Sequence, residues 1–137
     1  MVVLGVDHGR KRVGLAVSDP ASQHAFPLEA VDGKDRHKLF VRLVELIEER
    51  KVEEVVVGLP LTMLGEVGPQ ARKVLDFVER LSRQLGDEFP VVTWDERLSS
   101  AQADRGRPSS GKAGKKDGTR DMMAAVVILQ SYLDRKR

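Results

Sequence analysis

The segment VVLGVDHGRKRVGLAVSD, residues 2–19, decides the fold. Residues 2–6 and 12–18 are two short runs rich in valine and other apolar residues, and the turn-like sequence HGRK lies between them. Two such runs joined by a short polar connection predict a β-hairpin. Residues 26–31 repeat the pattern, so we expect the hairpin to extend to three antiparallel strands.

The rest of the chain alternates helical and strand patterns. Apolar residues recur at helical spacing in three segments, with charged residues at many of the remaining positions. The expected elements are a helix over residues 39–47, a strand over 54–59, a helix over 69–85, a strand over 91–94 and a helix over 120–134. Because a helical crossover joins parallel strands, the sequence predicts one α/β domain, residues 1–137, with a mixed five-stranded sheet flanked by helices.

The composition excludes several classes of protein. The chain has 137 residues, which suits a single domain, and it contains no cysteine, which excludes disulfides and thiol nucleophiles. His8, His24 and His37 lack metal-ligand spacing and are expected at the surface. No apolar run approaches the roughly 20 residues of a membrane span, and Asp7 interrupts the N-terminal apolar run. We therefore expect a cytoplasmic protein with no membrane contact.

Charge is unevenly distributed along the chain. The 23 basic and 21 acidic residues give a net charge of only +2. Basic residues nevertheless outnumber acidic ones between residues 97 and 120, and a stretch rich in glycine, serine and lysine at about 105–119 breaks every periodicity. This composition predicts a mobile basic loop. Such a loop attracts polyanions, although a solvated loop without a ligand is an equal alternative.

Three acidic residues stand where a ligand site is expected. Asp7 and Glu96 follow predicted strands, and Asp121 lies in the first turn of the last helix. Ligands of open α/β sheets gather at the carboxyl ends of the parallel strands. Each acid alone also suits an ordinary role in a turn, an ion pair or a helix start. Their joint placement at one sheet edge is what favours a site.

Three carboxylates brought together repel one another, and a bound cation is the economical reason to collect them. Carboxylate oxygens favour Mg²⁺ or Mn²⁺, and two such ions roughly 4 Å apart promote phosphoryl transfer to water. The sequence therefore predicts that Asp7, Glu96 and Asp121 are the catalytic and metal-binding residues of a phosphodiesterase. Asp95 points away from this group by strand alternation, so we expect it to have a structural role or to contact the residues that form the site.

Basic residues near these acids are candidates for phosphate contacts. Arg10, Lys11 and Arg12 follow the first acid. Alternate residues of a hairpin point to opposite faces, so we expect one or two of these three to bind substrate. Lys115 and Lys116 precede the last acid and can steady a nucleic-acid strand, with a solvated loop as the alternative.

Four motifs resemble those of the YqgF family, which is also called RuvX: VLGVDHGRKRVGLAVSD, VVVGLPLTMLGEVG, WDERLSSAQA and KKDGTRDMMAAVVILQSYL. The resemblance runs over residues 3–133, nearly the whole chain. It implies a ribonuclease H-like fold and places the family's three acids on Asp7, Glu96 and Asp121. The chain departs from the family in one loop, which commonly reads close to GLPLNMDG, because Thr62 and Leu64 replace its asparagine and aspartate.

The resemblance also implies an activity. Members of the family are known as pre-16S ribosomal RNA nucleases or Holliday junction resolvases, so the expected function is metal-dependent nucleic-acid cleavage, usually in maturation of the 5′ end of pre-16S rRNA. The expected partners are RNA or DNA and the pre-ribosomal particle. A resolvase or another DNA nuclease of recombination and repair is the alternative. A resolvase predicts a homodimer, whereas an rRNA nuclease can act as a monomer.

Two further interpretations compete with a nuclease. The spacing of Asp7, Gly9 and Gly14 is also typical of the phosphate loop of actin-like ATPases and sugar kinases. Those proteins clamp a nucleotide between two domains, and this chain supplies one. The other is a non-catalytic nucleic-acid-binding module that acts through the basic loop, and it predicts that loss of the carboxylates leaves function intact.

Overall fold

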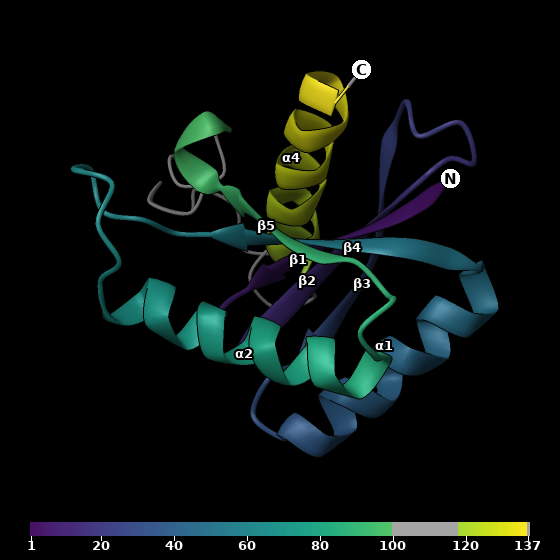
Figure 1. Ribbon diagram of the computed structural model, residues 1–137, viewed down its shortest axis with the longest axis horizontal. Coiled ribbons are helices and arrows are strands. Elements are labelled where there is room, and N and C mark those ends of the chain that lie inside the picture. Colours follow the sequence, from purple (N-terminus) through teal and green to yellow (C-terminus); the bar gives the residue numbers. More distant parts are fainter. Residues whose placement is uncertain (100–117, 137) are drawn as a thin grey trace.

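The computed structural model describes residues 1–99 and 118–136. The elements follow the predicted order (Figure 1), and no helix in these ranges is long and apolar enough to cross a membrane. The sequence predicts the basic loop at about 105–119, and residues 105–117 of it lie outside the described residues. Thr119, the last residue of the predicted loop, is the first residue of the last helix. The elements are β1 Val2–His8, β2 Arg12–Ser18, β3 Ala25–Asp32, α1 Arg36–Arg50, β4 Val52–Leu59, α2 Pro69–Leu85, β5 Val91–Asp95, a 3-10 helix Glu96–Leu98 and α4 Thr119–Lys136.

One sheet holds all five strands, in the order β3-β2-β1-β4-β5. β2 pairs antiparallel with β1 and with β3, as the hairpin pattern predicts. β4 pairs parallel with β1 and with β5, because α1 and α2 carry the chain back along the sheet. The predicted mixed α/β fold is confirmed. The carboxyl ends of β1, β4 and β5 therefore meet at one edge.

Helices cover both faces of the sheet, α1 and α2 on one face and α4 on the other (Figure 1). Leu4 and Val6 of β1 belong to the core under α1 and α2, whereas Val3 belongs to the core under α4. Successive strand residues point to opposite faces, so β1 supplies both cores and has no polar side chain between Val2 and Val6. The same alternation puts Asp7 on the α4 face.

Local chemistry sets the ends of α1 and α2. The carboxylate of Asp35 caps α1 by accepting a hydrogen bond of 3.1 Å from the N–H of Lys38. Pro69 stands in the first turn of α2, where its missing N–H is not needed. Gly86 ends the helix with φ at 97°, which glycine tolerates best.

Glycines let α4 approach the sheet closely. A Cβ atom at Gly58 would lie 2.5 Å from Cδ1 of Ile128. The approach is closer at Gly14, where a Cβ atom would lie 2.0 Å from the backbone oxygen of Asp121. Atoms in a close-packed interior cannot overlap in this way. The first turn of α4 therefore lies directly on β2, beside the end of β1.

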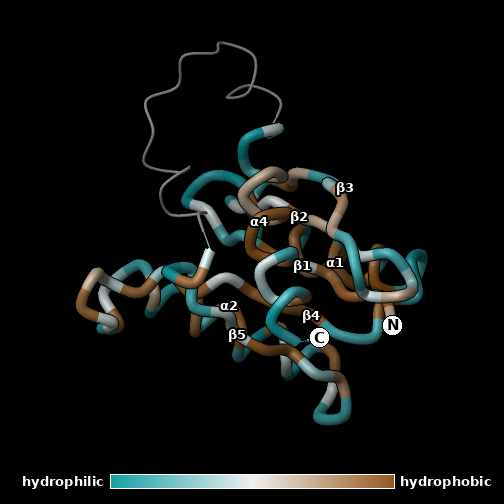
Figure 2. The backbone as a smooth tube through the Cα atoms, turned by 90° about the horizontal axis from the view of Figure 1, so that it is seen from above, coloured by the Kyte–Doolittle hydropathy of each residue, from teal (hydrophilic) through white to brown (hydrophobic). Residues whose placement is uncertain are grey.

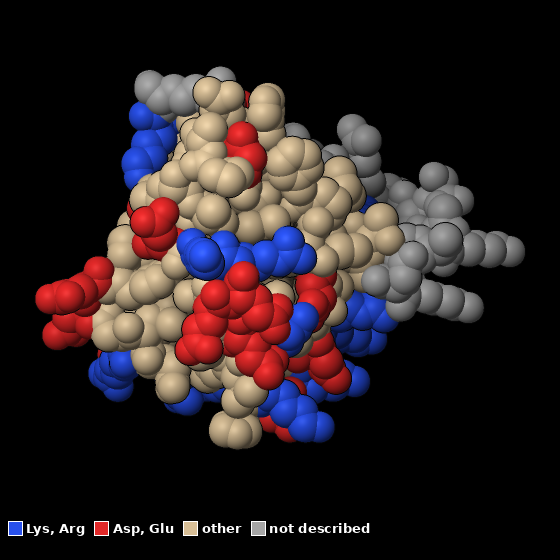
Figure 3. Space-filling model, turned by 90° about the vertical axis from the view of Figure 1, so that its right-hand side faces the viewer, with Lys and Arg blue, Asp and Glu red and all other residues tan. Residues whose placement is uncertain are grey.

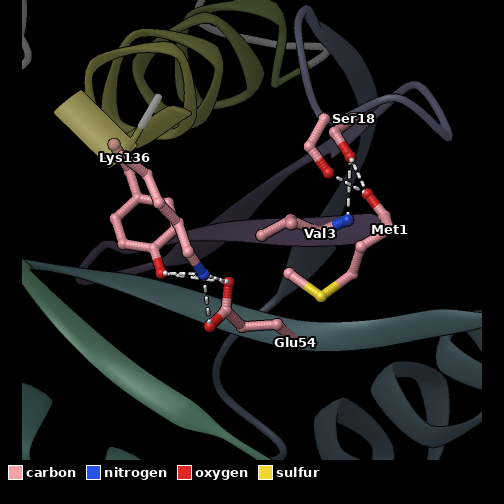
Figure 4. A network of polar contacts seen from close by, with 7 residues as sticks. Met1, Val3, Ser18, Glu54 and Lys136 are labelled. Carbon is pink, nitrogen blue, oxygen red and sulfur yellow. Dashed lines mark hydrogen bonds and ion pairs between the residues drawn. The ribbon is translucent and has the colours of Figure 1, made fainter. Parts of the chain in front are cut away.

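A buried acid ties the far end of α4 to the sheet (Figure 4). Glu54 of β4 is 6% exposed, and its Oε1 accepts a hydrogen bond of 3.0 Å from the hydroxyl of Tyr132. The ammonium group of Lys136 donates to both carboxylate oxygens of Glu54, at 3.3 and 3.4 Å. Burial raises the pKa of Tyr132 above its usual value, which keeps the hydroxyl a hydrogen-bond donor to Glu54. Figure 4 also shows Ser18, whose Oγ accepts a hydrogen bond of 2.8 Å from the N–H of Val3.

We expect Tyr132→Phe to lower the free energy of unfolding by about 1–2 kcal/mol, because it removes one donor from a buried carboxylate. Urea unfolding at neutral pH measures this change. The double variant Glu54→Gln/Tyr132→Phe should lose less than the sum of the two single losses, since the two side chains contact each other. Strictly additive losses would show that the hydrogen bond adds nothing to stability.

Two surface features stand out from the packed interior. The loop between β4 and α2, residues 60–68, projects from the carboxyl-end edge of the sheet, and its tip is among the hydrophobic segments in Figure 2. Met63 and Leu64 in this loop are 89% and 84% exposed. On the face shown in Figure 3, acidic side chains form a patch beside a band of basic ones. Most of the basic stretch between residues 97 and 120 lies outside the described residues, so the positive face that this stretch predicts stays a prediction.

Candidate functional site

Asp7 stands near the carboxyl end of β1 and is only 2% exposed. Its partner in β2 is Gly14. On the other side, Val6 pairs with Val57 of β4, which makes Gly58 the neighbour of Asp7. Neither glycine has a side chain, so residues of other segments can approach the sheet closely on both sides of Asp7.

Glu96 occupies the space over Gly58. It begins the 3-10 helix after β5, where Asp95 caps the turn by accepting a hydrogen bond of 2.9 Å from the N–H of Arg97. Glu96 is 1% exposed, and a Cβ atom at Gly58 would lie 3.1 Å from its Oε2. The carboxylate of Glu96 therefore lies over β4, on the same face of the sheet as Asp7.

Asp121 reaches the same region from α4. Its backbone lies over Gly14, as the 2.0 Å approach shows, and a Cβ atom at Gly9 would lie 4.0 Å from its Oδ1. Asp7 therefore lies between the other two acids, with Glu96 over one neighbouring strand and Asp121 over the other. The fold brings the three predicted acids to one edge of the sheet.

A pocket of about 490 Å³ opens beside these acids. Two of the three acids, Asp7 and Asp121, line it, and Glu96 is not part of its described lining. Three further side chains on its wall can contact an anion, namely Arg10, Gln70 and Arg120. The pocket therefore combines carboxylates that suit a cation with groups that suit a phosphate.

The predicted phosphate contacts separate into three groups. Arg10 lines the pocket, as the hairpin argument allows. Arg12 is half-buried and its Cδ lies beside Gly118, whereas Lys11 is exposed and its carbonyl accepts a hydrogen bond from Gly33. Neither Lys11 nor Arg12 belongs to the described lining. Lys115 and Lys116 lie outside the described residues.

Sequence reasoning missed two residues of the pocket, Gln70 and Arg120. Arg120 directly precedes a predicted acid in the first turn of a helix, and that position was the available signal. Gln70 stands in the first turn of α2, after a loop whose path the sequence does not reveal. It reaches the pocket because α2 begins at the same sheet edge where β4 ends.

Asp95 has the structural role that strand alternation predicts. Its carboxylate accepts hydrogen bonds from the guanidinium of Arg97, the shortest at 2.7 Å, and these bonds hold the pKa of Asp95 below its usual range. The guanidinium lies against Gly65, where a Cβ atom would be 3.0 Å from Nη1. Gly65 also has φ at 82°, which favours glycine. This contact anchors the loop 60–68 next to the segment that carries Glu96.

The expectation that His8 lies at the surface is wrong. Its ring is half-buried on the α1 and α2 face and packs against Phe77, with ring centroids 4.6 Å apart. Burial lowers the pKa of His8, and the positive charges of Arg36 and Lys73 lower it further. Strand alternation explains the position, because the residue after Asp7 must point to the opposite face.

The donor chemistry of the three acids suits a hard divalent cation. Asp7, Glu96 and Asp121 offer only carboxylate oxygens, the ligands that Mg²⁺ and Mn²⁺ prefer. Within the described ranges, no three such side chains lie close enough together to form a complete ligand set. Each of the three acids also makes at least one further polar or electrostatic contact. The fit therefore rests on the donor type, on the burial of Asp7 and Glu96, and on the pocket that Asp7 and Asp121 line.

Comparison with solved structures defines the class of fold. RuvC of Thermus thermophilus in complex with a Holliday junction substrate matches with a TM-score of 0.61 and 19% identity, and the match covers 100% of this chain and 95% of that chain. The Holliday junction resolvase of fowlpox virus gives a TM-score of 0.56 and 16% identity, with 98% and 99% covered. The chain has the RuvC-like ribonuclease H fold, as the resemblance implies.

Comparison of sequences shows the family. A family model described as "RuvX: Holliday junction resolvase" matches residues 1–135. A protein of Caldanaerobacter subterraneus is 45% identical over 145 residues, covering 100% of this chain and 99% of the relative. A protein of Ruminiclostridium cellulolyticum is 43% identical over 137 residues, covering 98% and 95%. Both are named "Putative pre-16S rRNA nuclease". The chain belongs to the RuvX family.

Proposed function

We propose that this protein is a divalent-metal-dependent nuclease that hydrolyses phosphodiester bonds during maturation of the 5′ end of pre-16S rRNA, in the cytoplasm. The observation that carries the proposal is the position of Asp7 between two glycines, with Glu96 over one and Asp121 over the other. The choice of substrate is supported by the names of relatives that are 43% and 45% identical to the chain.

Each residue of the site has a distinct role in this proposal. Mg²⁺ or Mn²⁺, bound as two ions, would supply an activated water and stabilise the leaving oxygen. Asp7, Glu96 and Asp121 would hold the ions, and Asp7 lies between the other two acids. Arg10 and Arg120 line the pocket and would bind the phosphate oxygens beside the cleaved bond. Lys115 and Lys116 remain predicted contacts to the same strand.

Cleavage of a labelled pre-16S rRNA fragment that includes the 5′ leader tests the proposal. We expect discrete new 5′ ends, mapped by primer extension, when Mn²⁺ or Mg²⁺ is present, and none when the metal is chelated. Random fragments, or products that persist in chelator, would contradict a specific metal-dependent site.

Resolution of Holliday junctions is the second candidate, because the matching family model carries that description. A resolvase cuts two symmetry-related strands, so this function predicts paired cuts in a four-way DNA junction and a homodimer by sizing. Junction cleavage without rRNA cleavage would replace the proposed function. Tight binding of either substrate without any cleavage would favour a non-catalytic binding module.

A further inference from the structure

A second pocket lies at the same end of β1, on the opposite face of the sheet from the acids. It has a volume of about 530 Å³ and is lined by His8, Arg36, Arg72, Lys73 and Asp76. His8 directly follows Asp7 in β1, and neighbouring strand residues point to opposite faces. Consecutive residues of one strand therefore serve the two pockets.

The second pocket carries an excess of positive charge. Its single acid is shared between two arginines, because Oδ2 of Asp76 lies 3.6 Å from Nη1 of Arg36 and 3.3 Å from Nε of Arg80. Arg72 and Lys73 make no ion pair with any residue in the described ranges. Both side chains are exposed on the first turns of α2. Two cations are therefore available to an anionic ligand.

One side chain of this pocket, His8, packs against the hydrophobic core. The ring of His8 packs on Phe77, and Phe77 in turn stacks on Phe40 of α1, with ring centroids 5.6 Å apart. Phe77 is only 1% exposed. These rings join β1, α1 and α2, so the start of α2, which carries Arg72 and Lys73, is packed against the strand that carries Asp7.

The start of α2 connects the two pockets. Gln70 lines the pocket of the acids, whereas Arg72 and Lys73, one turn or less further along, line the second pocket. Charge along α1 favours this end as well, because its first residue is Arg36 and the acids Glu45 and Glu49, both more than half exposed, lie toward its other end. A polyanion would be attracted to the carboxyl-end edge of the sheet and repelled further along α1.

We propose that the second pocket binds phosphate groups of the same nucleic-acid strand that is cleaved in the first pocket. The strand would pass from the α4 face around the start of α2, and Arg72 and Lys73 would contact its backbone one or more nucleotides from the cleaved bond. Such contacts fix the position of a strand without reading its bases. This inference rests on the proposed function, because it extends the path of that substrate.

Binding of single-stranded RNA by Arg72→Gln/Lys73→Gln tests the proposal. Fluorescence anisotropy in chelator, where nothing is cleaved, compares an RNA of about 20 nucleotides with a dinucleotide, whose single phosphate can occupy only one pocket. We expect the double variant to bind the long RNA about tenfold more weakly. The slope of log K against log salt should also become less steep by about 1 to 2. Binding of the dinucleotide should change little.

The control variant is Arg50→Gln/Arg83→Gln. It removes the same amount of charge as the test variant, but at the last turns of α1 and α2, away from the second pocket. We expect it to bind both RNAs like the wild type. An equal loss in both double variants would show a general effect of charge and overturn the proposal, as would wild-type binding by Arg72→Gln/Lys73→Gln. A third result would also overturn the proposal. If a nucleoside monophosphate binds the wild type but not the variant, and both bind the long RNA equally, the second pocket binds a free anion and not a nucleic-acid strand.

Parallel cleavage assays separate this inference from the proposed function. If the variant loses affinity for the long RNA but the wild type cleaves no substrate with either metal, the second pocket stands as a nucleic-acid contact and the proposed cleavage fails. If the wild type cleaves RNA and the variant binds the long RNA like the wild type, the proposed function stands and the proposal that the second pocket binds nucleic acid is wrong.

Discussion

Asp7→Asn is expected to lower metal-dependent cleavage at least about a thousand-fold, because it replaces a charged oxygen ligand by a neutral amide in the centre of the site. Asp7 has this central position because its two neighbours across the sheet, Gly14 and Gly58, leave room for the other acids. Initial rates of cleavage of labelled RNA at saturating Mn²⁺ measure the effect.

The matched control for this variant is Asp87→Asn, which makes the same change at an exposed residue in the connection after α2. We expect it to cleave at the wild-type rate. Thermal unfolding in chelator should show that Asp7→Asn stays folded, since the amide fills the same volume as the carboxylate. Cleavage by Asp7→Asn within about tenfold of the wild type would mean that the metal-binding centre lies elsewhere.

Gly14→Ala should destabilise the protein by about 3 kcal/mol or more and disrupt the site. The added Cβ atom would lie 2.0 Å from the backbone oxygen of Asp121, and a backbone atom cannot move aside as a flexible side chain can. The first turn of α4 must therefore shift away from β2 and carry Asp121 with it. Urea unfolding gives the loss of stability, and cleavage at a temperature where the variant is folded gives the effect on the site.

Gly33→Ala is the control for the glycine substitution. A Cβ atom there would lie at an ordinary contact distance of 3.4 Å from its nearest neighbours. We expect a change in the free energy of unfolding within about 1 kcal/mol, in either direction. If Gly14→Ala unfolds at the same urea concentration as Gly33→Ala, the close approach of α4 to β2 does not contribute to stability.

Much of the fold is predictable from local pattern. The hairpin of β1 and β2 follows from two apolar runs around a polar turn, and the crossovers through α1 and α2 require β4 and β5 to run parallel to β1. Asp35, Pro69 and Gly86 mark helix ends by their own chemistry. These features depend on residues close together in the sequence, which is why the sequence alone indicates them.

The site is predictable only in part, because it depends on how distant segments approach. Strand ends predict that Asp7 and Glu96 share one edge, but the roles of Gly14 and Gly58 depend on the depth at which α4 lies on the sheet. The same tertiary approach brings Gln70 of α2 to the pocket. The position of His8, by contrast, can be predicted from the sequence. Its residue type suggests the surface, but strand alternation predicts that it points to the face opposite Asp7.

The central claim is that Asp7, Glu96 and Asp121 bind the catalytic metal ions. Anomalous diffraction from a crystal soaked in Mn²⁺ tests it most directly. We expect one or two peaks within about 2.0–2.3 Å of carboxylate oxygens of these acids, and the loss of those peaks in a crystal of Asp7→Asn. A wild-type crystal with no peak at this edge of the sheet, or with its strongest peak bound by other residues, would contradict the account.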